Sequence, residues 1–256
     1  MKKLVFGLIA IVLIANMSFG QNILNEETIG EIHNQQMDLY YTKIYNLLKE
    51  QKDQKIKKET FYELFDNQIN DFWGSNNEKL VLDASNGFKQ NLNLTLLEST
   101  NKKIDEIKNS KNISDKLKKF LLDLISESEK INSDQITAFY NEKKELATIQ
   151  FESNDLKLAL ISINVGKSSQ EYWNNNINKW NDLIKDATGT SQSLSKGTVG
   201  KADLVGVIAG GIWGGLGGTA VLPGVGTVTG AVAVGLTTGF YMSLVAAVKT
   251  LVDFFF

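Results

Sequence analysis

Residues 204–248 read LVGVIAGGIWGGLGGTAVLPGVGTVTGAVAVGLTTGFYMSLVAAV, and no charged side chain interrupts them. Twelve of the chain's 21 glycines fall between Gly206 and Gly239. An uncharged apolar run of about 18 residues is long enough for one membrane-spanning helix, and this run is long enough for two. We therefore predict a transmembrane helical hairpin, with helices over 204–221 and 227–248 and a turn at 222–226 that contains Pro223 and Gly224. A hairpin buried inside a soluble helical protein is the alternative.

The spacing of the glycines predicts how these two helices pack. Gly206, Gly210, Gly214 and Gly218 recur at every fourth position, which places them along one ridge of the first helix. Helices in lipid associate through close contact at such small residues. On the second helix two glycine pairs, Gly226 with Gly230 and Gly235 with Gly239, lie nearly opposite each other. One face can therefore meet the first helix and the other a second copy of the chain, giving a homo-oligomer. The predicted packing residues are Gly206, Gly210, Gly211, Gly214, Gly215, Gly218, Gly226, Gly230, Gly235 and Gly239.

The N-terminus has the pattern of a secretory signal peptide over residues 1–20. Two lysines follow Met1, an apolar stretch covers 4–15, and a small-x-small cleavage site precedes Gln21. An uncleaved N-terminal anchor is the alternative. We expect the chain to be exported to the periplasm or the outside and to associate with a membrane through its C-terminal hairpin.

Residues 21–201 differ in character from both ends. They contain no proline and few glycines, and Lys, Glu, Asn, Ile and Leu dominate, a composition that favours helices. We predict an all-α fold, with a helical bundle or elongated helical module of five to seven helices over 21–187, a flexible linker at 188–202 and the hairpin at 203–256. The expected helices cover about 26–52, 56–73, 80–107 with a break near Gly87, 115–131 capped by Ser114, 134–164 capped by Ser133, and 168–186.

The residues needed for common enzymatic chemistry are scarce. The chain has no cysteine and one histidine, His33, which we expect at the surface or in a groove. A zinc site of the His/Cys kind and a phosphate-binding loop are excluded, and we expect no catalytic residue, metal or cofactor. All 27 basic residues are lysine. Because base recognition relies heavily on arginine, nucleic-acid binding is disfavoured. The chain is predicted not to be an enzyme.

Two tryptophans seven residues apart, Trp173 and Trp180, are expected to pack in the core of the helical module. The alternative is an amphipathic helix whose tryptophans lie at lipid headgroups. Trp213 falls inside the first predicted apolar helix, where it could face another protein surface.

The stretch Gly206–Gly239 resembles the glycine-zipper hairpins of bacteriocins and of contact-dependent antibacterial toxins, and more loosely the C-terminal hydrophobic hairpin of pore-forming colicins. The resemblance implies a hairpin that inserts into a target bilayer and depolarises it, with an immunity or receptor protein as a further partner. It covers about fifty residues, and no family is recognised for 21–200. We therefore expect a secreted, bacteriocin-like, pore-forming toxin. The alternative is a periplasmic helical scaffold or adaptor that uses the hairpin only as an anchor.

Overall fold

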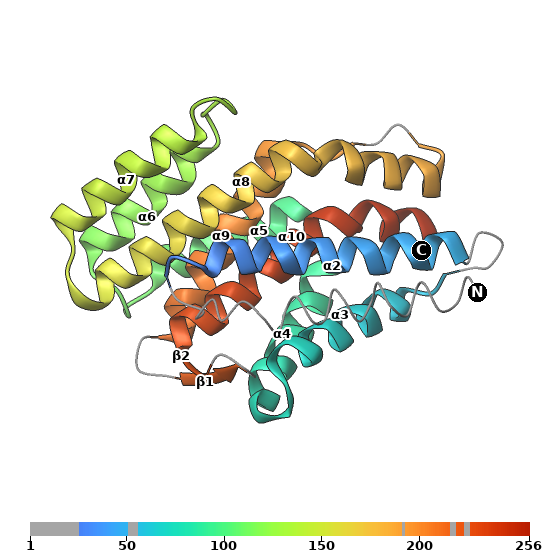
Figure 1. Cartoon of the computed structure of the whole chain (residues 1–256), viewed down its shortest axis with the longest axis horizontal. Coiled ribbons are helices and arrows are strands. Elements are labelled where there is room, and N and C mark those ends of the chain that lie inside the picture. Colours follow the sequence, from blue (N-terminus) through green and yellow to red (C-terminus); the bar gives the residue numbers. More distant parts are fainter. Residues whose placement is uncertain (1–25, 51–55, 191–192, 216–218, 223–225) are drawn as a thin grey trace, which may run out of the picture.

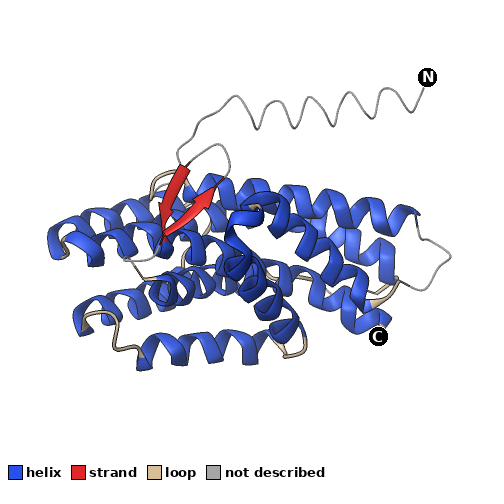
Figure 2. Cartoon of the chain, turned by 90° about the horizontal axis from the view of Figure 1, so that it is seen from below, coloured by secondary structure: helices blue, strands red, loops and turns tan. Residues whose placement is uncertain are grey.

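The computed structural model describes residues 26–50, 56–190, 193–215, 219–222 and 226–256, so the predicted signal peptide lies outside the described residues. Within these ranges the chain is helical apart from one short strand pair (Figures 1 and 2), which confirms the predicted all-α class. The helices are α2 (Ile29–Glu50), α3 (Lys58–Trp73), α4 (Glu78–Leu92), α5 (Leu96–Asn109), α6 (Asp115–Ser128), α7 (Ile136–Gln150), α8 (Ser153–Thr188), α9 (Lys196–Gly214) and α10 (Gly230–Phe255), with a short 3-10 helix at Ser75–Asn77.

The predicted break near Gly87 is wrong, because this residue lies inside α4. A Cβ at Gly87 would come within 3.0 Å of the Tyr241 ring. Glycine at this position therefore allows α10 to pack closely against α4. The chain instead breaks between α4 and α5, just before Thr95. The Thr95 hydroxyl accepts a hydrogen bond from the Glu98 backbone N–H, and the Glu98 carboxylate accepts one from the Thr95 N–H, which makes a capping box.

Of the next two predicted helices, over 115–131 and 134–164, the structure confirms the first and divides the second. Ser114 caps α6 as predicted, since its hydroxyl accepts a hydrogen bond from the Leu117 backbone N–H at 3.1 Å. The single helix expected over 134–164 is wrong, because α7 ends at Gln150 and α8 begins at Ser153. The buried Phe151 ring between them packs edge-on against Phe120 of α6, which turns the chain at this point. Ser133 is not a cap; its hydroxyl bonds to the Asn174 side chain.

The C-terminal region departs from the predicted helix bounds. The first apolar helix, α9, begins at Lys196 and ends at Gly214, and Gly215 follows with a left-handed φ of 59° that glycine favours. Strands β1 (Thr219–Leu222) and β2 (Gly226–Thr229) then pair antiparallel, with Thr219 opposite Thr229 and Leu222 opposite Gly226. Helix α10 starts at Gly230, where the Thr229 hydroxyl accepts the Val232 N–H. Part of the segment expected as a linker, from Lys196 onward, is therefore helical.

Helices α9 and α10 pack against each other in the middle of the molecule, and the other helices surround them (Figure 1). Helices α2, α3, α4, α5 and α8 contact α10, whereas α5, α6 and α8 contact α9. Two apolar cores result, and α9 lies between them: Val207 belongs to the core shared with α10, and Leu204 and Ile208 belong to the core shared with α6 and α7. Much of the uncharged stretch of sequence thus forms the centre of the fold.

Candidate functional site

The glycines of α9 lie directly against the backbone of α10. A Cβ built at Gly206 would lie 2.8 Å from the Thr238 carbonyl oxygen, and one at Gly210 would lie 2.5 Å from the Val234 carbonyl oxygen. A Cβ at Gly214 would collide with the Gly230 carbonyl. Real side chains do not tolerate such contacts, so the two helices approach this closely only because these positions are glycine.

Helix α10 also contributes small residues to its contact with α9. A Cβ at Gly235 would lie 3.3 Å from the Val207 carbonyl oxygen, and one at Gly239 would collide with the Val207 side chain. Gly211 instead faces α8, where its Cβ would lie 2.5 Å from Leu158 Cδ1. The expected Gly226–Gly230 helix face does not form, because Gly226 belongs to β2 and Gly230 begins α10. Gly215 has the positive φ described above. Gly218, Pro223 and Gly224 lie outside the described residues.

Helix α10 is also the one described helix that is long and apolar enough to cross a membrane. Almost all of its apolar stretch is buried inside the protein, as the central helix of a soluble protein would be. Helix α9 is less apolar than α10, since Lys196, Lys201 and Asp203 lie in its first half. The described structure therefore holds the apolar pair inside a helical shell.

A polar cluster interrupts this apolar interior near the start of α9. The fully buried Asp203 carboxyl is hydrogen-bonded by the Ser169 hydroxyl and, at 3.0 Å, by the Trp173 indole N–H, both from α8. Its other oxygen bonds to the Ser243 hydroxyl of α10. His33 of α2 places Nε2 3.1 Å from the Ser243 hydroxyl and 3.7 Å from the nearer Asp203 oxygen. Four helices therefore meet at one carboxyl group.

Burial sets the charge of this cluster, since a low-dielectric interior disfavours ions. It raises the pKa of the Asp203 carboxyl to about 8 and lowers the pKa of the His33 imidazole to about 4. Near pH 7 both groups are therefore mainly uncharged. The cluster thus adds polar contacts to the centre of the molecule without adding net charge.

The expectation that His33 lies at the surface or in a groove is wrong, because its side chain is fully buried. Its hydrogen-bond partner Ser243 is 210 residues away in the sequence, so no local pattern indicates the contact. Sequence reasoning also missed Asp203. A signal existed, because Asp203 is the last charged residue before the uncharged run, at the point where α9 enters the core.

Neither family models, nor curated proteins, nor solved structures give a significant match to this chain.

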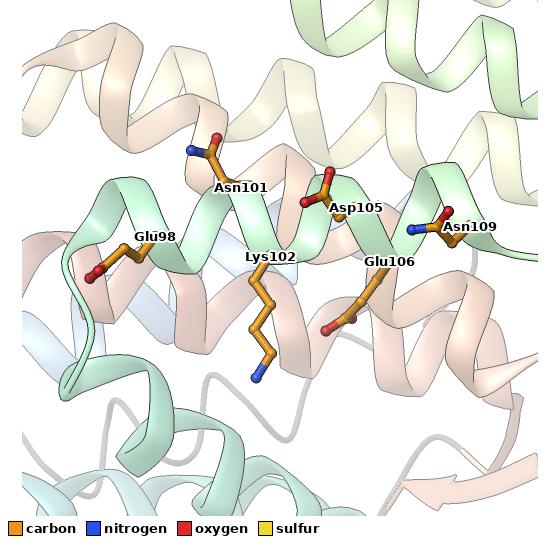
Figure 3. Close-up of a pocket in the computed structure, with 6 residues that line it drawn as sticks. All are labelled: Glu98, Asn101, Lys102, Asp105, Glu106 and Asn109. Carbon is orange, nitrogen blue, oxygen red and sulfur yellow. The ribbon is translucent and has the colours of Figure 1, made fainter.

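The surface of the described residues offers weaker evidence for a functional site. A surface depression lies along the exposed side of α5, where the side chains spread along a single helix (Figure 3). Its lining residues are Glu98, Asn101, Lys102, Asp105, Glu106 and Asn109. Glu98 is engaged in the capping box, and Glu106 pairs with Lys103 at 2.9 Å, so these carboxylates serve α5 itself. Among the described residues no group of acidic, histidine or cysteine side chains could hold a metal ion.

The three tryptophans considered in the sequence lie in two environments. Trp173 and Trp180 are fully buried in the core, as preferred from the sequence. Trp213, one residue before the end of α9, is 71% exposed. It is the largest exposed apolar side chain on the described surface.

Proposed function

We propose that this chain is an exported, membrane-active protein that releases α9 and α10 from its helical shell and inserts them into a target bilayer, which they permeabilise. The observation that carries the proposal is the uncharged run of residues 204–248, stored as a glycine-packed pair inside a shell of amphipathic helices. The partner is the lipid bilayer, and the glycines support assembly of several copies within it.

The charges on the two helices suit an insertion led by the strand pair. On α9 the charged residues Lys196, Lys201 and Asp203 lie in the first half, and on α10 Lys249 and Asp253 lie near the end. Between Asp203 and Lys249 there is none. Charged side chains are expensive inside a bilayer. Entry by the strand pair and Trp213 leaves all five charged residues on the side from which the protein came.

Burial of α10 disfavours the alternative of a simple anchor, because an anchor presents its apolar faces to lipid rather than to its own protein. The competing interpretation is a soluble protein in which α10 remains the central core helix. The two differ in one event: insertion requires α9 and α10 to separate from α2 and α8, whereas a soluble core never opens.

A reversible disulfide between α8 and α9 tests that event. A Cβ at Gly200 would lie 3.3 Å from Gln170 Cγ, close to the roughly 3 Å between a Cβ and the far sulfur of an unstrained disulfide. Because the chain contains no cysteine, the double variant Gln170→Cys/Gly200→Cys carries only this pair. Residues 21–256 of the variant are added to liposomes that contain a fluorescent dye. We expect the oxidised form to release at least tenfold less dye than the reduced form.

The same protein before and after reduction provides the matched control. Wild-type chain treated with the same oxidant and reductant should release dye equally under both conditions. Equal release by the oxidised and reduced variant would contradict the proposed opening. Stable liposome binding without release, by the reduced variant and wild type alike, would favour the anchored scaffold, and no binding would favour the soluble core. Truncation before α9 is a poor control, since it removes the centre of the fold.

A further inference from the structure

We propose that Asp203 is held as a protonated carboxylic acid in the closed structure, and that its ionisation on reaching water helps α9 and α10 to leave α2 and α8. The inference rests on the proposed function and adds a built-in driving element to it. The bond that breaks is the carboxyl O–H, and its proton passes to solvent water as α9 separates.

The hydrogen bonds of the cluster form a consistent set when no group is charged. The His33 Nδ1 lies 3.1 Å from the Asn34 side-chain oxygen, which can only accept, so Nδ1 carries the imidazole proton. Nε2 then accepts from the Ser243 hydroxyl. That hydroxyl also contacts Asp203 Oδ1, and a protonated Oδ1 would donate to the Ser243 oxygen in this contact, whereas an ionised Oδ1 would accept from Ser243. The remaining Asp203 oxygen accepts from Ser169 and Trp173. Every polar hydrogen in the cluster has one acceptor.

An ionised Asp203 would break this set. If His33 is neutral, its Nε2 and the Asp203 carboxylate oxygen both need a hydrogen from Ser243, whose hydroxyl has only one. One of these two contacts then brings two lone pairs together without a proton between them. A buried charge without a compensating partner is strongly unfavourable. The closed structure is therefore stable with the proton on Asp203, and loss of that proton weakens the contact between the four helices.

Apart from His33, which lies 3.7 Å away and whose pKa burial lowers to about 4, the described groups that face Asp203 supply no cation that could compensate an ionised carboxylate. Helix α2 contributes His33, α7 contributes the Tyr140 ring, and α8 contributes Tyr172, whose hydroxyl approaches Asp38 at 3.3 Å. Burial raises the pKa of both tyrosines, so they too remain neutral. Helix α10 presents the uncharged Ser243. On α9 itself the neighbouring Lys201 pairs with Glu129 at 2.9 Å.

Two variants with opposite expected effects test the inference. Asparagine reproduces the protonated acid, because its amide donates to Ser243 while its oxygen accepts from Ser169 and Trp173, yet it cannot ionise. Asp203→Asn should therefore keep the pair closed and slow dye release at pH 7.5 at least tenfold. Ser169→Ala removes one hydrogen bond from the cluster without removing the acid, and it should speed release severalfold.

A purely structural role for Asp203 predicts that both variants loosen the cluster and speed release. Release by Asp203→Asn at or above the wild-type rate would therefore overturn the inference. A second readout does not involve the membrane: the infrared band of a protonated carboxyl should be present in the wild type at pH 7 and missing from Asp203→Asn. An ionised carboxylate at that pH would also overturn it. A protonated Asp203 in a wild type that releases no dye would refute the proposed function and, with it, the driving role of the acid.

Discussion

Replacing Asp203 with Asn is expected to abolish a fall in folding stability between about pH 6.5 and pH 8. The folded carboxyl has a pKa raised to about 8 from 3.8, so between these values the folded state holds a proton that the unfolded state has lost. Stability therefore falls as the pH rises, by about 1.4 kcal/mol per pH unit. Above pH 8 both states are ionised, and the loss is complete.

Between about pH 4 and pH 6.5, His33 changes the folding stability in the opposite direction. Its folded pKa is lowered to about 4 from 6.5, so between these values the unfolded state binds the extra proton and stability rises with pH. In the wild type the two slopes nearly cancel between about pH 4 and pH 6.5. The remaining fall between pH 6.5 and pH 8 amounts to about 2 kcal/mol.

Urea unfolding of both proteins from pH 4 to pH 9 measures this difference, and subtraction removes the groups that the two proteins share. The difference between the two curves, wild type minus Asp203→Asn, should fall steadily from about pH 4 to pH 8 and then flatten. Two parallel curves would show that Asp203 has the same pKa in the folded and unfolded states.

Gly210→Leu is expected to cost the folded protein more than about 3 kcal/mol, because a Cβ at this position already collides with the α10 backbone. Gly197→Leu is the matched control: it is the same substitution in the same helix, at an exposed glycine with nothing within 4 Å of the added Cβ. Because glycine is a poor helix former, this control should be neutral or up to about 1 kcal/mol more stable.

Thermal unfolding of the two variants beside the wild type makes the comparison. Equal melting temperatures for Gly210→Leu and Gly197→Leu would contradict the packing described for α9 and α10. The result also guides leakage experiments, because a bulky residue at Gly210 disturbs the closed fold before any membrane is met. Gly235→Ala is the gentler probe of packing in the bilayer, since its Cβ would lie 3.3 Å from the nearest atom.

The sequence predicted the helices whose signals are local. Ser114 and the apolar spacing after it were enough for α6, and the four-residue repeat of Gly206, Gly210 and Gly214 was enough to predict a face of close approach. That face meets α10 in the closed fold, whereas packing within a membrane remains a prediction. Periodicity alone did not show that α9 ends at Gly214, where the left-handed Gly215 and the following strands interrupt an unbroken apolar pattern.

The features that sequence reasoning missed depend on contacts between distant segments. Gly87 resembles a helix break until the Tyr241 ring of α10 is placed against it. His33 resembles a surface residue until Ser243 and Asp203 are brought to it from the other end of the chain. A lone acid at the edge of an uncharged run was the one visible sign of the buried cluster, and its burial follows only from the packing of α2, α8 and α10 around α9.

Quenching of Trp213 by lipids brominated deep in their acyl chains tests the central claim most directly. In the closed structure Trp213 is exposed to water, while Trp73, Trp173 and Trp180 are buried in the protein. If α9 and α10 enter the bilayer, these lipids should quench a fraction of the tryptophan emission, and Trp213→Phe should lose that quenched fraction. Emission that the brominated lipids leave unchanged, at protein and lipid concentrations where the chain binds the vesicles, would contradict insertion of the pair.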